Sequence, residues 1–231
     1  MTTHNPKEVA GIYAANLVTE GMVVGLGTGS TATFMIKHLG KRVSEGLHIT
    51  AIPTSEASAQ LAQSLGIPLV GFGEVDHIDI TIDGADEIDG RFDMLKGGGG
   101  ALLREKVVAS LTKRQVCIVD PIKVVEQMGK FPLPVEVVPF GWEVVAHRIT
   151  ALGGKYTLRQ TKEAAPKTYV TDNGNYILDC DFYPITDAPA LERTIKMMPG
   201  VVEVGLFIQM AHTLIIGNED GTCTVKERDS Q

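Results

Sequence analysis

The stretch Met22–Thr31, MVVGLGTGST, joins a short apolar run to a turn rich in glycine and hydroxyl residues. The hydrophobic periodicity predicts a β-strand over 22–26 and a helix over 31–39, so the glycines fall where a strand passes into a helix. Glycines there let the backbone approach a ligand, and free amides at a helix N-terminus favour an anion. The stretch predicts an anion-binding loop, with a tight turn capped by Ser30 as the alternative.

The spacing of these glycines favours a single phosphate over a dinucleotide. A dinucleotide fingerprint, GxGxxG, needs its third glycine one place later than Gly29 and an acidic residue about 20 positions further on. The next predicted strand ends instead in Pro53-Thr54-Ser55. A nucleotide-dependent dehydrogenase is therefore the least favoured reading.

Short β-rich runs alternate with helical patterns on both sides of this turn. Such alternation is typical of parallel strands joined by right-handed crossovers, which form a Rossmann-like, doubly wound sheet. The remaining expected strands are 48–53, 67–70, 78–82 and 115–119, and the remaining expected helices are 6–18, 55–65 and 101–111.

The rhythm changes at Phe131, where a proline-rich segment begins. If 155–160 and 168–171 form one interrupted strand, the order becomes β-α-β-β-α-β, which is ferredoxin-like. The other elements expected here are strands 135–138, 175–180 and 201–204 and helices 142–152 and 190–197, before strands 205–209 and 213–216 return to the first sheet. We therefore expect an α/β fold with two domains: a Rossmann-like catalytic domain (1–130 plus 205–231) and a smaller ferredoxin-like α+β domain (131–204).

Composition excludes several classes of protein. The 231 residues carry a net charge of −7 with no cluster of Lys and Arg, which argues against nucleic acid as a partner. No run approaches the ~20 apolar residues of a membrane span, and Lys7 and Glu8 interrupt any signal peptide. Three widely spaced cysteines suit a reducing compartment and favour neither a disulfide framework nor a zinc site. We expect a soluble, cytoplasmic protein.

A pair of carboxylates, Asp83 and Asp86, follows the apolar strand 78–82 in the sequence DGAD. In open α/β sheets the carboxyl ends of the strands form the usual ligand crevice. Two nearby carboxylates could serve acid–base chemistry there. A solvated turn and a magnesium site are the alternatives that this motif leaves open.

A second glycine run, Gly97–Gly100, follows Lys96 and precedes a helix. Four consecutive glycines cost backbone entropy, and they make sense where amides must point at a developing oxyanion beside a positive charge. The alternative is a flexible linker. Glu105 and Lys123 are unremarkable by spacing alone, since a Glu between Arg and Lys is typical of a solvated helix face.

Taken in order, these motifs strongly resemble the type A ribose-5-phosphate isomerases along essentially the whole chain. The motifs are GTGST, DGADEID, KGGGGALLREK and VDPIK…GKFPLPVEVVP, followed by VTDNGN and PGVVEVGLF. The resemblance implies an enzyme of the pentose phosphate pathway that interconverts ribose 5-phosphate and ribulose 5-phosphate with neither metal nor cofactor. It also implies a homo-oligomer, a homodimer or alternatively a tetramer.

The resemblance further implies a role for each motif residue. Glu105 would be the general base, while Asp83 and Asp86 would contact the sugar hydroxyls and open the ring or move protons. Lys96 and the glycine amides would stabilise the enediolate, and Lys123 would bring positive charge to the substrate. The other residues expected to hold substrate are Thr28, Gly29, Ser30, Thr31, Gly84, Ala85, Gly97, Gly98 and Gly99.

One position departs from the family pattern, because Ile122 stands before Lys123 where a small hydroxyl residue is usual. Lys7 is a further candidate for the phosphate. Two rivals to an isomerase remain: a non-catalytic sugar-phosphate sensor, which has no use for Glu105, and a metal-dependent enzyme that uses Asp83 and Asp86 as ligands.

Overall fold

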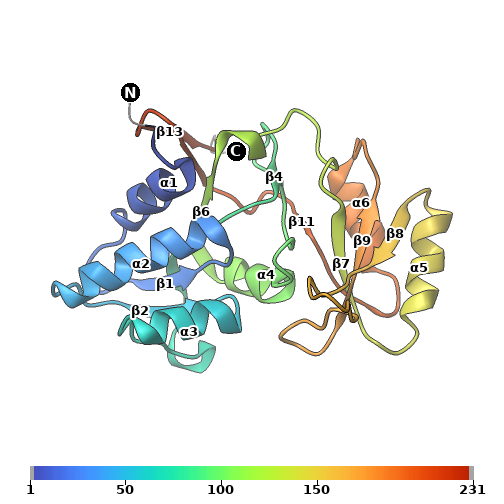
Figure 1. Cartoon of the computed structure of the whole chain (residues 1–231), viewed down its shortest axis with the longest axis horizontal. Helices are drawn as coiled ribbons and strands as arrows, with labels where there is room; N and C mark the ends of the chain where they lie inside the picture. The colour runs from blue at the N-terminus through green and yellow to red at the C-terminus, as the bar shows by residue number, and fades with distance from the viewer. Residues whose placement is uncertain (1–2, 229–231) are drawn as a thin grey trace. The chain divides into compact units, whose positions relative to one another are not determined.

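The computed structural model describes residues 3–228, and these divide into two compact units (Figure 1). Within them the first unit comprises 3–85, 104–124 and 209–228, and the second comprises 86–103 and 125–208. This division differs from the predicted one, since residues 86–103, 125–130 and 205–208 fall in the second unit rather than the first.

The first unit is built on a six-stranded sheet. Its strands, in the order β13-β12-β6-β3-β1-β2, are parallel except for the edge strand β13. They are β1 (Val23–Leu26), β2 (Thr50–Pro53), β3 (Ile78–Asp83), β6 (Thr112–Val119), β12 (Thr213–Gly217) and β13 (Cys223–Glu227). The mostly parallel sheet confirms the predicted fold class, and β12 returns to it as expected.

Two sequence predictions about this sheet were wrong or incomplete. The expected strand 67–70 is reduced to a single bridge between Ala51 and Leu69, because the chain touches the sheet there for one residue only. The edge strand β13 was not predicted: its burial pattern is mostly exposed, so it lacks the apolar run that marks the buried strands.

The parallel strands follow the order 2-1-3-4-5 when counted along the chain, so the winding direction reverses between β1 and β3. Such a switch point is where open α/β sheets bind ligands. The helices of this unit are α1 (Pro6–Ala15), α2 (Ser30–Ser44), α3 (Glu56–Ser64) and the greater part of α4 (Leu102–Ser110), with short 3₁₀ turns η1 (Phe72–Glu74) and η2 (Pro121–Lys123).

Ordinary capping and burial explain these helices. Asn5 accepts a hydrogen bond from the Lys7 amide and precedes Pro6 at the first position of α1. Ser55 caps α3 in the same way through the Ser58 amide. Helices α1 and α2 lie side by side (Figure 1), and Met35 of α2 belongs to the same buried cluster as Leu26 of β1.

The second unit contains a four-stranded antiparallel sheet in the order β10-β7-β9-β8. Its elements along the chain are β7 (Leu133–Val137), α5 (Trp142–Ala151), β8 (Lys155–Leu158), β9 (Tyr176–Asp181), α6 (Ala188–Lys196) and β10 (Val201–Val204). The order β-α-β-β-α-β confirms the ferredoxin-like prediction. Leu133, Val135 and Val137 of β7 share one buried cluster with Ile149 of α5 and Ile195 of α6.

The predicted interrupted strand over 155–160 and 168–171 is wrong in one respect. Gln160 forms a single antiparallel bridge with Thr168, so the chain doubles back over 161–167 instead of continuing in one direction. The Asp172-Asn173-Gly174 turn is present, because the Thr171 amide donates to the carbonyl of Asn175 at 2.9 Å. The strand order survives because only β8 and β9 enter the sheet.

A third, small sheet explains why 86–103 belongs to the second unit. Its strands are β4 (Glu87–Ile88), β5 (Met94–Leu95) and β11 (Leu206–Phe207), in the order β11-β5-β4. The prediction that 205–209 returns to the first sheet was wrong, since Leu206 pairs with Leu95 and both are fully buried in the second unit's core.

Candidate functional site

The predicted site residues fall into two groups, one in each unit. The chain passes from the first unit to the second between Ala85 and Asp86, and it returns between Leu103 and Arg104. Asp83 thus belongs to the first unit and Asp86 to the second. Every residue singled out in the motifs from GTGST to VDPIK lies in the described part of the chain.

The loop between β1 and α2 has the geometry of an anion site. Gly29, the N-cap of α2, has φ 109° and ψ −179°, a conformation essentially confined to glycine. No side chain caps the first amides of this 15-residue helix among the described residues. The amides of Ser30 and Thr31 therefore begin a helix whose positive end faces the loop, as phosphate binding requires.

A lysine from another helix reaches the same loop. The Lys7 ammonium of α1 donates to the Ser30 hydroxyl at 3.2 Å, and it lies 3.8 Å from a carboxylate oxygen of Asp120. The structure thus brings Lys7 to the loop, where the sequence left it as a secondary candidate. Lys123 is half-buried in η2, directly after β6, and the neighbouring Ile122 is 81% exposed.

The Thr28 side chain belongs to a cluster of hydroxyls that sequence reasoning missed. Its Oγ1 lies 2.7 Å from that of Thr54, 2.8 Å from Ser55 Oγ and 3.2 Å from Ser58 Oγ. Ser58 in turn donates to the carbonyl of Gly27 at 2.7 Å. Thr28 therefore ties the loop to the start of α3. The sequence signal for this cluster was the segment Pro53-Thr54-Ser55, which begins with the last residue of β2 and ends in the serine that caps α3.

Asp83 closes the loop from the neighbouring strand. It stands at the end of β3 with 2% exposure, and its Oδ1 accepts from the Thr28 amide at 3.0 Å and the Gly84 amide at 2.7 Å. Gly27 is required here, since a Cβ on it would lie 2.3 Å from that same oxygen. The carboxylate is thus placed at the switch point between β1 and β3. Ala85 follows as the last residue before the chain first enters the second unit.

Glu105 lies in the first turn of α4 and is 5% exposed. The charged triplet around it favoured a solvated helix face, and this alternative is wrong for Glu105 itself. Arg104 turns outward and forms an ion pair with Glu56 at 2.7 Å. Val108, one turn later, packs with Ile52 and Ile78. Charged side chains on helices usually remain in water, and burying a carboxylate costs free energy. The burial of Glu105 therefore marks it as a candidate functional residue.

In the second unit, Asp86 and the second glycine run contact each other. An Asp86 carboxylate oxygen accepts from the Gly98 amide at 2.7 Å, and the Asp86 amide donates to the carbonyl of Leu95. Lys96 is 3% exposed, and its backbone amide donates a hydrogen bond to the carbonyl of Gly205. Its ammonium lies 5.5 Å from the centre of the Phe207 ring. A buried cation over an aromatic face is electrostatically favourable.

The glycines after Lys96 form a tight turn rather than a linker. The Gly100 amide donates to the carbonyl of Gly97, and both residues have positive φ (82° and 101°). A Cβ on Gly98 would lie 2.6 Å from Asp86 Oδ1, and one on Gly100 would lie 2.3 Å from the Tyr169 hydroxyl. The flexible-linker alternative is therefore wrong. Gly98 and Gly99 line a cleft of about 1180 Å³ within this unit.

Among residues 3–228, no helix has the length and the apolar composition that a membrane-spanning segment requires. Within the same range, no group of three or more His, Cys, Asp or Glu side chains is arranged to hold a metal ion. Cys117, Cys180 and Cys223 are free thiols, and the first two are buried.

The fold and the loop together define the class: an open α/β protein with a glycine-capped helix N-terminus at the switch point of its parallel sheet. Within that class, the family model for ribose 5-phosphate isomerase A (phosphoriboisomerase A) matches residues 50–221. The ribose-5-phosphate isomerase A of Bacillus mycoides strain KBAB4 is 49% identical over 218 residues, 94% of this chain and 97% of that protein.

Solved structures agree with the sequence relatives. A D-ribose-5-phosphate isomerase in complex with phospho-erythronic acid is 35% identical, with a TM-score of 0.93 over 97% of this chain and 100% of that one. The ribose 5-phosphate isomerase A of Methanocaldococcus jannaschii is 40% identical, with a TM-score of 0.90 over 96% and 97%. The chain belongs to the ribose-5-phosphate isomerase A family.

Proposed function

We propose that this chain is an aldose–ketose isomerase that interconverts D-ribose 5-phosphate and D-ribulose 5-phosphate. Membership of the family supports the reaction and the substrate together. The burial of Glu105 is the observation that carries the catalytic assignment. It is a carboxylate kept from water on an otherwise ordinary helix, directly after a turn of glycines, and a general base needs such a position.

The proposed reaction begins with the phosphate of the open-chain aldose at the first amides of α2, near Lys7. Glu105 removes the proton from C2 and returns it to C1, while the C2 hydroxyl loses its proton and the C1 oxygen gains one. The aldehyde thereby becomes a hydroxymethyl group and C2 becomes the ketone. The intermediate is a cis-enediolate. General acid–base catalysis of this kind contributes about 10²–10⁴ in rate.

The enediolate needs fixed donors for its negative charge. We assign this role to the Lys96 ammonium and the amides of Gly97 and Gly99. The Gly98 amide instead donates to Asp86, and this bond holds the turn so that no rearrangement is required. Asp83 and Asp86 contact the sugar hydroxyls and move the hydroxyl protons. Removal of one such donor costs about a hundredfold or more in kcat.

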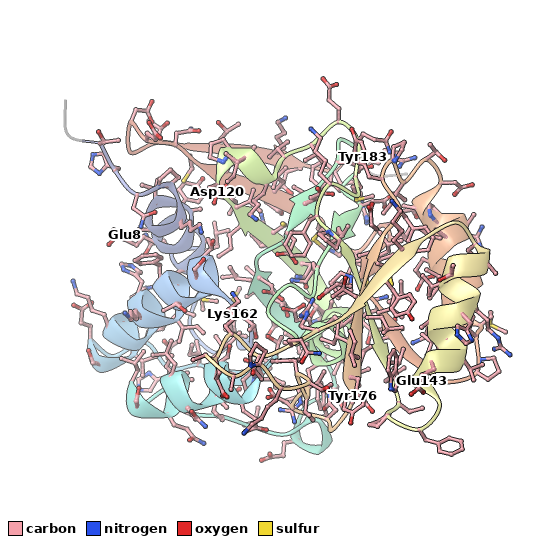
Figure 2. The ribbon with its side chains drawn as sticks, turned by 45° about the vertical axis from the view of Figure 1, so that its right-hand side comes forward. Glu8, Asp120, Glu143, Lys162, Tyr176 and Tyr183 are labelled. Atoms are coloured by element: carbon pink, nitrogen blue, oxygen red, sulfur yellow. The ribbon has the colours of Figure 1, made fainter. Side chains whose placement is uncertain are left out.

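The decisive experiment follows ribulose 5-phosphate formation from ribose 5-phosphate in excess EDTA, with wild type beside Glu105→Gln. Turnover by the wild type and a loss of at least about 100-fold in the variant are expected. The matched control is Glu143→Gln, an exposed glutamate of α5 (Figure 2), which should leave turnover unchanged. Near-normal turnover by Glu105→Gln would remove the general base from the proposal.

The same assay separates the two rivals. A metal-dependent enzyme that uses Asp83 and Asp86 would lose activity in EDTA and regain it with magnesium. A sugar-phosphate sensor would bind ribose 5-phosphate, or phospho-erythronic acid, without turnover. The carboxylate of phospho-erythronic acid, beside a hydroxyl, imitates the charge and shape of the enediolate and is therefore a suitable binding probe.

The proposal includes a homodimer, a place in the pentose phosphate pathway and a cytoplasmic location, as the resemblance and composition suggest. Among the described residues, three large apolar side chains are more than 80% exposed, and a second copy would cover them in a dimer: Phe140 (94%), Met197 (82%) and Ile122 (81%). Light scattering coupled to gel filtration checks this directly. A mass of 24.8 kDa in solution would mean a monomer and would contradict the dimer.

A further inference from the structure

The peptide units of the second glycine turn are held from both sides. The carbonyl of Gly97 accepts from the Arg159 guanidinium at 2.8 Å, and the amide of the same peptide unit, on Gly98, donates to Asp86 at 2.7 Å. The carbonyl of Gly98 lies 3.3 Å from the same guanidinium nitrogen. The Gly98 carbonyl and the Gly99 amide belong to one peptide unit, and in a trans peptide the C=O and the N–H point in opposite directions. Because the carbonyl points at Arg159, the Gly99 amide points away from it.

Arg159 is itself fixed. Its Nε and Nη2 form a two-point ion pair with the two carboxylate oxygens of Asp179 on β9, and this leaves Nη1 for the glycine carbonyls. The side chain is only 13% exposed. Such a fork distributes its donors in one plane, an arrangement that the single ammonium of lysine cannot reproduce.

Tyr169 completes the support. Its amide donates to the carbonyl of Arg159, and the guanidinium lies 5.9 Å from the centre of its ring. The phenol oxygen is 3.5 Å from the carbonyl of Gly99 and leaves no room for a Cβ on Gly100. Burial raises the pKa of Tyr169, so the phenol stays protonated and keeps its donor.

All three supporting residues line the cleft that Gly98 and Gly99 also line. Nε and Nη2 of Arg159 donate to Asp179 and Nη1 donates to the two carbonyls, so its guanidinium acts on the turn. We propose that Arg159 is a positioning residue: held by Asp179 and Tyr169, it fixes the peptide planes of Gly97–Gly99 so that the Gly99 amide is aimed at the enediolate. The inference rests on the proposed function, in which these amides stabilise that intermediate.

The test is steady-state kinetics of Arg159→Ala and Arg159→Lys. Misaligned donors act on the transition state, so kcat should fall about 10- to 100-fold in both variants while KM changes less than about threefold. Added guanidinium ion at millimolar concentration should restore part of kcat in Arg159→Ala. It should restore nothing in Glu105→Gln, whose lost group is a carboxylate. The exposed Arg148→Ala serves as the matched control.

Asp179→Asn covers the case in which Arg159→Ala fails to fold, because it keeps the shape and weakens only the hold on Arg159. A loss of kcat in the same direction is expected, with a thermal midpoint near wild type. Wild-type kcat in Arg159→Ala or in Asp179→Asn would overturn the inference. So would a loss of kcat that matches a loss of folded protein and is not restored by guanidinium.

The assay also separates this inference from the proposed function. Inactive Glu105→Gln beside fully active Arg159→Ala would overturn the positioning role alone. Wild-type protein that binds ribose 5-phosphate without converting it would overturn the proposed function and, with it, any role for Arg159 in catalysis.

Discussion

The substitution Gly27→Ala tests whether the loop and Asp83 form one rigid unit. The added Cβ would lie 2.6 Å from the Asp83 Cα and 2.3 Å from its Oδ1, where ordinary contact begins at 3.4 Å. The carboxylate cannot rotate away without losing the Thr28 and Gly84 amides. The loop and the end of β3 must therefore separate by about 0.8 Å, a backbone shift of the kind that overpacking forces.

The expected losses of stability and activity in Gly27→Ala follow from that shift. Overpacking of this kind costs about 1–3 kcal/mol of unfolding free energy. For a chain of this length each kcal/mol lowers Tm by about 2–4 °C, so a fall of about 2–12 °C is expected. A displacement near 1 Å at a reacting group costs about 100-fold in rate, so kcat/KM should fall by about that factor.

The assay combines a thermal melt with ribose 5-phosphate turnover, and Gly73→Ala is the matched control. Gly73 is exposed in η1, and a Cβ there meets no atom within 4 Å. That control should be as stable as wild type, or up to about 1 kcal/mol more stable, because alanine restricts the unfolded chain. If Gly27→Ala melts within about 1 °C of wild type and keeps its activity, the rigid coupling of loop and carboxylate is refuted.

Two further expectations concern polar groups of the first unit. Thr28→Val should cost only about 1 kcal/mol in a thermal melt, because each partner hydroxyl keeps another hydrogen bond; a loss above about 3 kcal/mol would contradict this. Burial, with Arg228 and Arg114 nearby, lowers the pKa of His212, whose Nδ1 accepts from the Gln115 amide. The unfolded chain therefore takes up a proton first as pH falls through about 6.5, and unfolding free energy should drop more steeply in wild type than in His212→Asn between pH 7.5 and 5.5. Parallel curves for the two proteins would show that His212 is not the cause of this pH dependence.

The parallel sheet and the ferredoxin-like order were predictable because each depends on local signals. An isoleucine at every second position of 78–82 marks β3, and Ser55 marks the start of α3. The small third sheet could not be predicted. Its strands have two residues each, too few for any periodicity, and its pairing of Leu95 with Leu206 joins positions that are 111 residues apart.

The candidate site was predictable where a motif forces unusual backbone, as at Gly29 and Gly97, whose positive φ admits little else. Roles that depend on packing were not. Glu105 looks solvent-facing by spacing, and only its burial in the folded chain distinguishes it from Arg104 beside it. Arg159 lies in no motif, since its partners are carbonyls about 60 residues away in the chain.

The two aspartates of DGAD show how a chain with net charge −7 can prepare sites for an anion. Asp83 accepts from the Thr28 amide in the first glycine loop, and Asp86 accepts from the Gly98 amide in the second. Each carboxylate therefore orients a loop through its backbone. An asparagine could also accept these hydrogen bonds, so holding the loops does not by itself require charge. Because a charge costs more to bury than an amide, the choice of aspartate at both positions supports the proposed chemistry, in which a carboxylate can take a hydroxyl proton and an amide cannot.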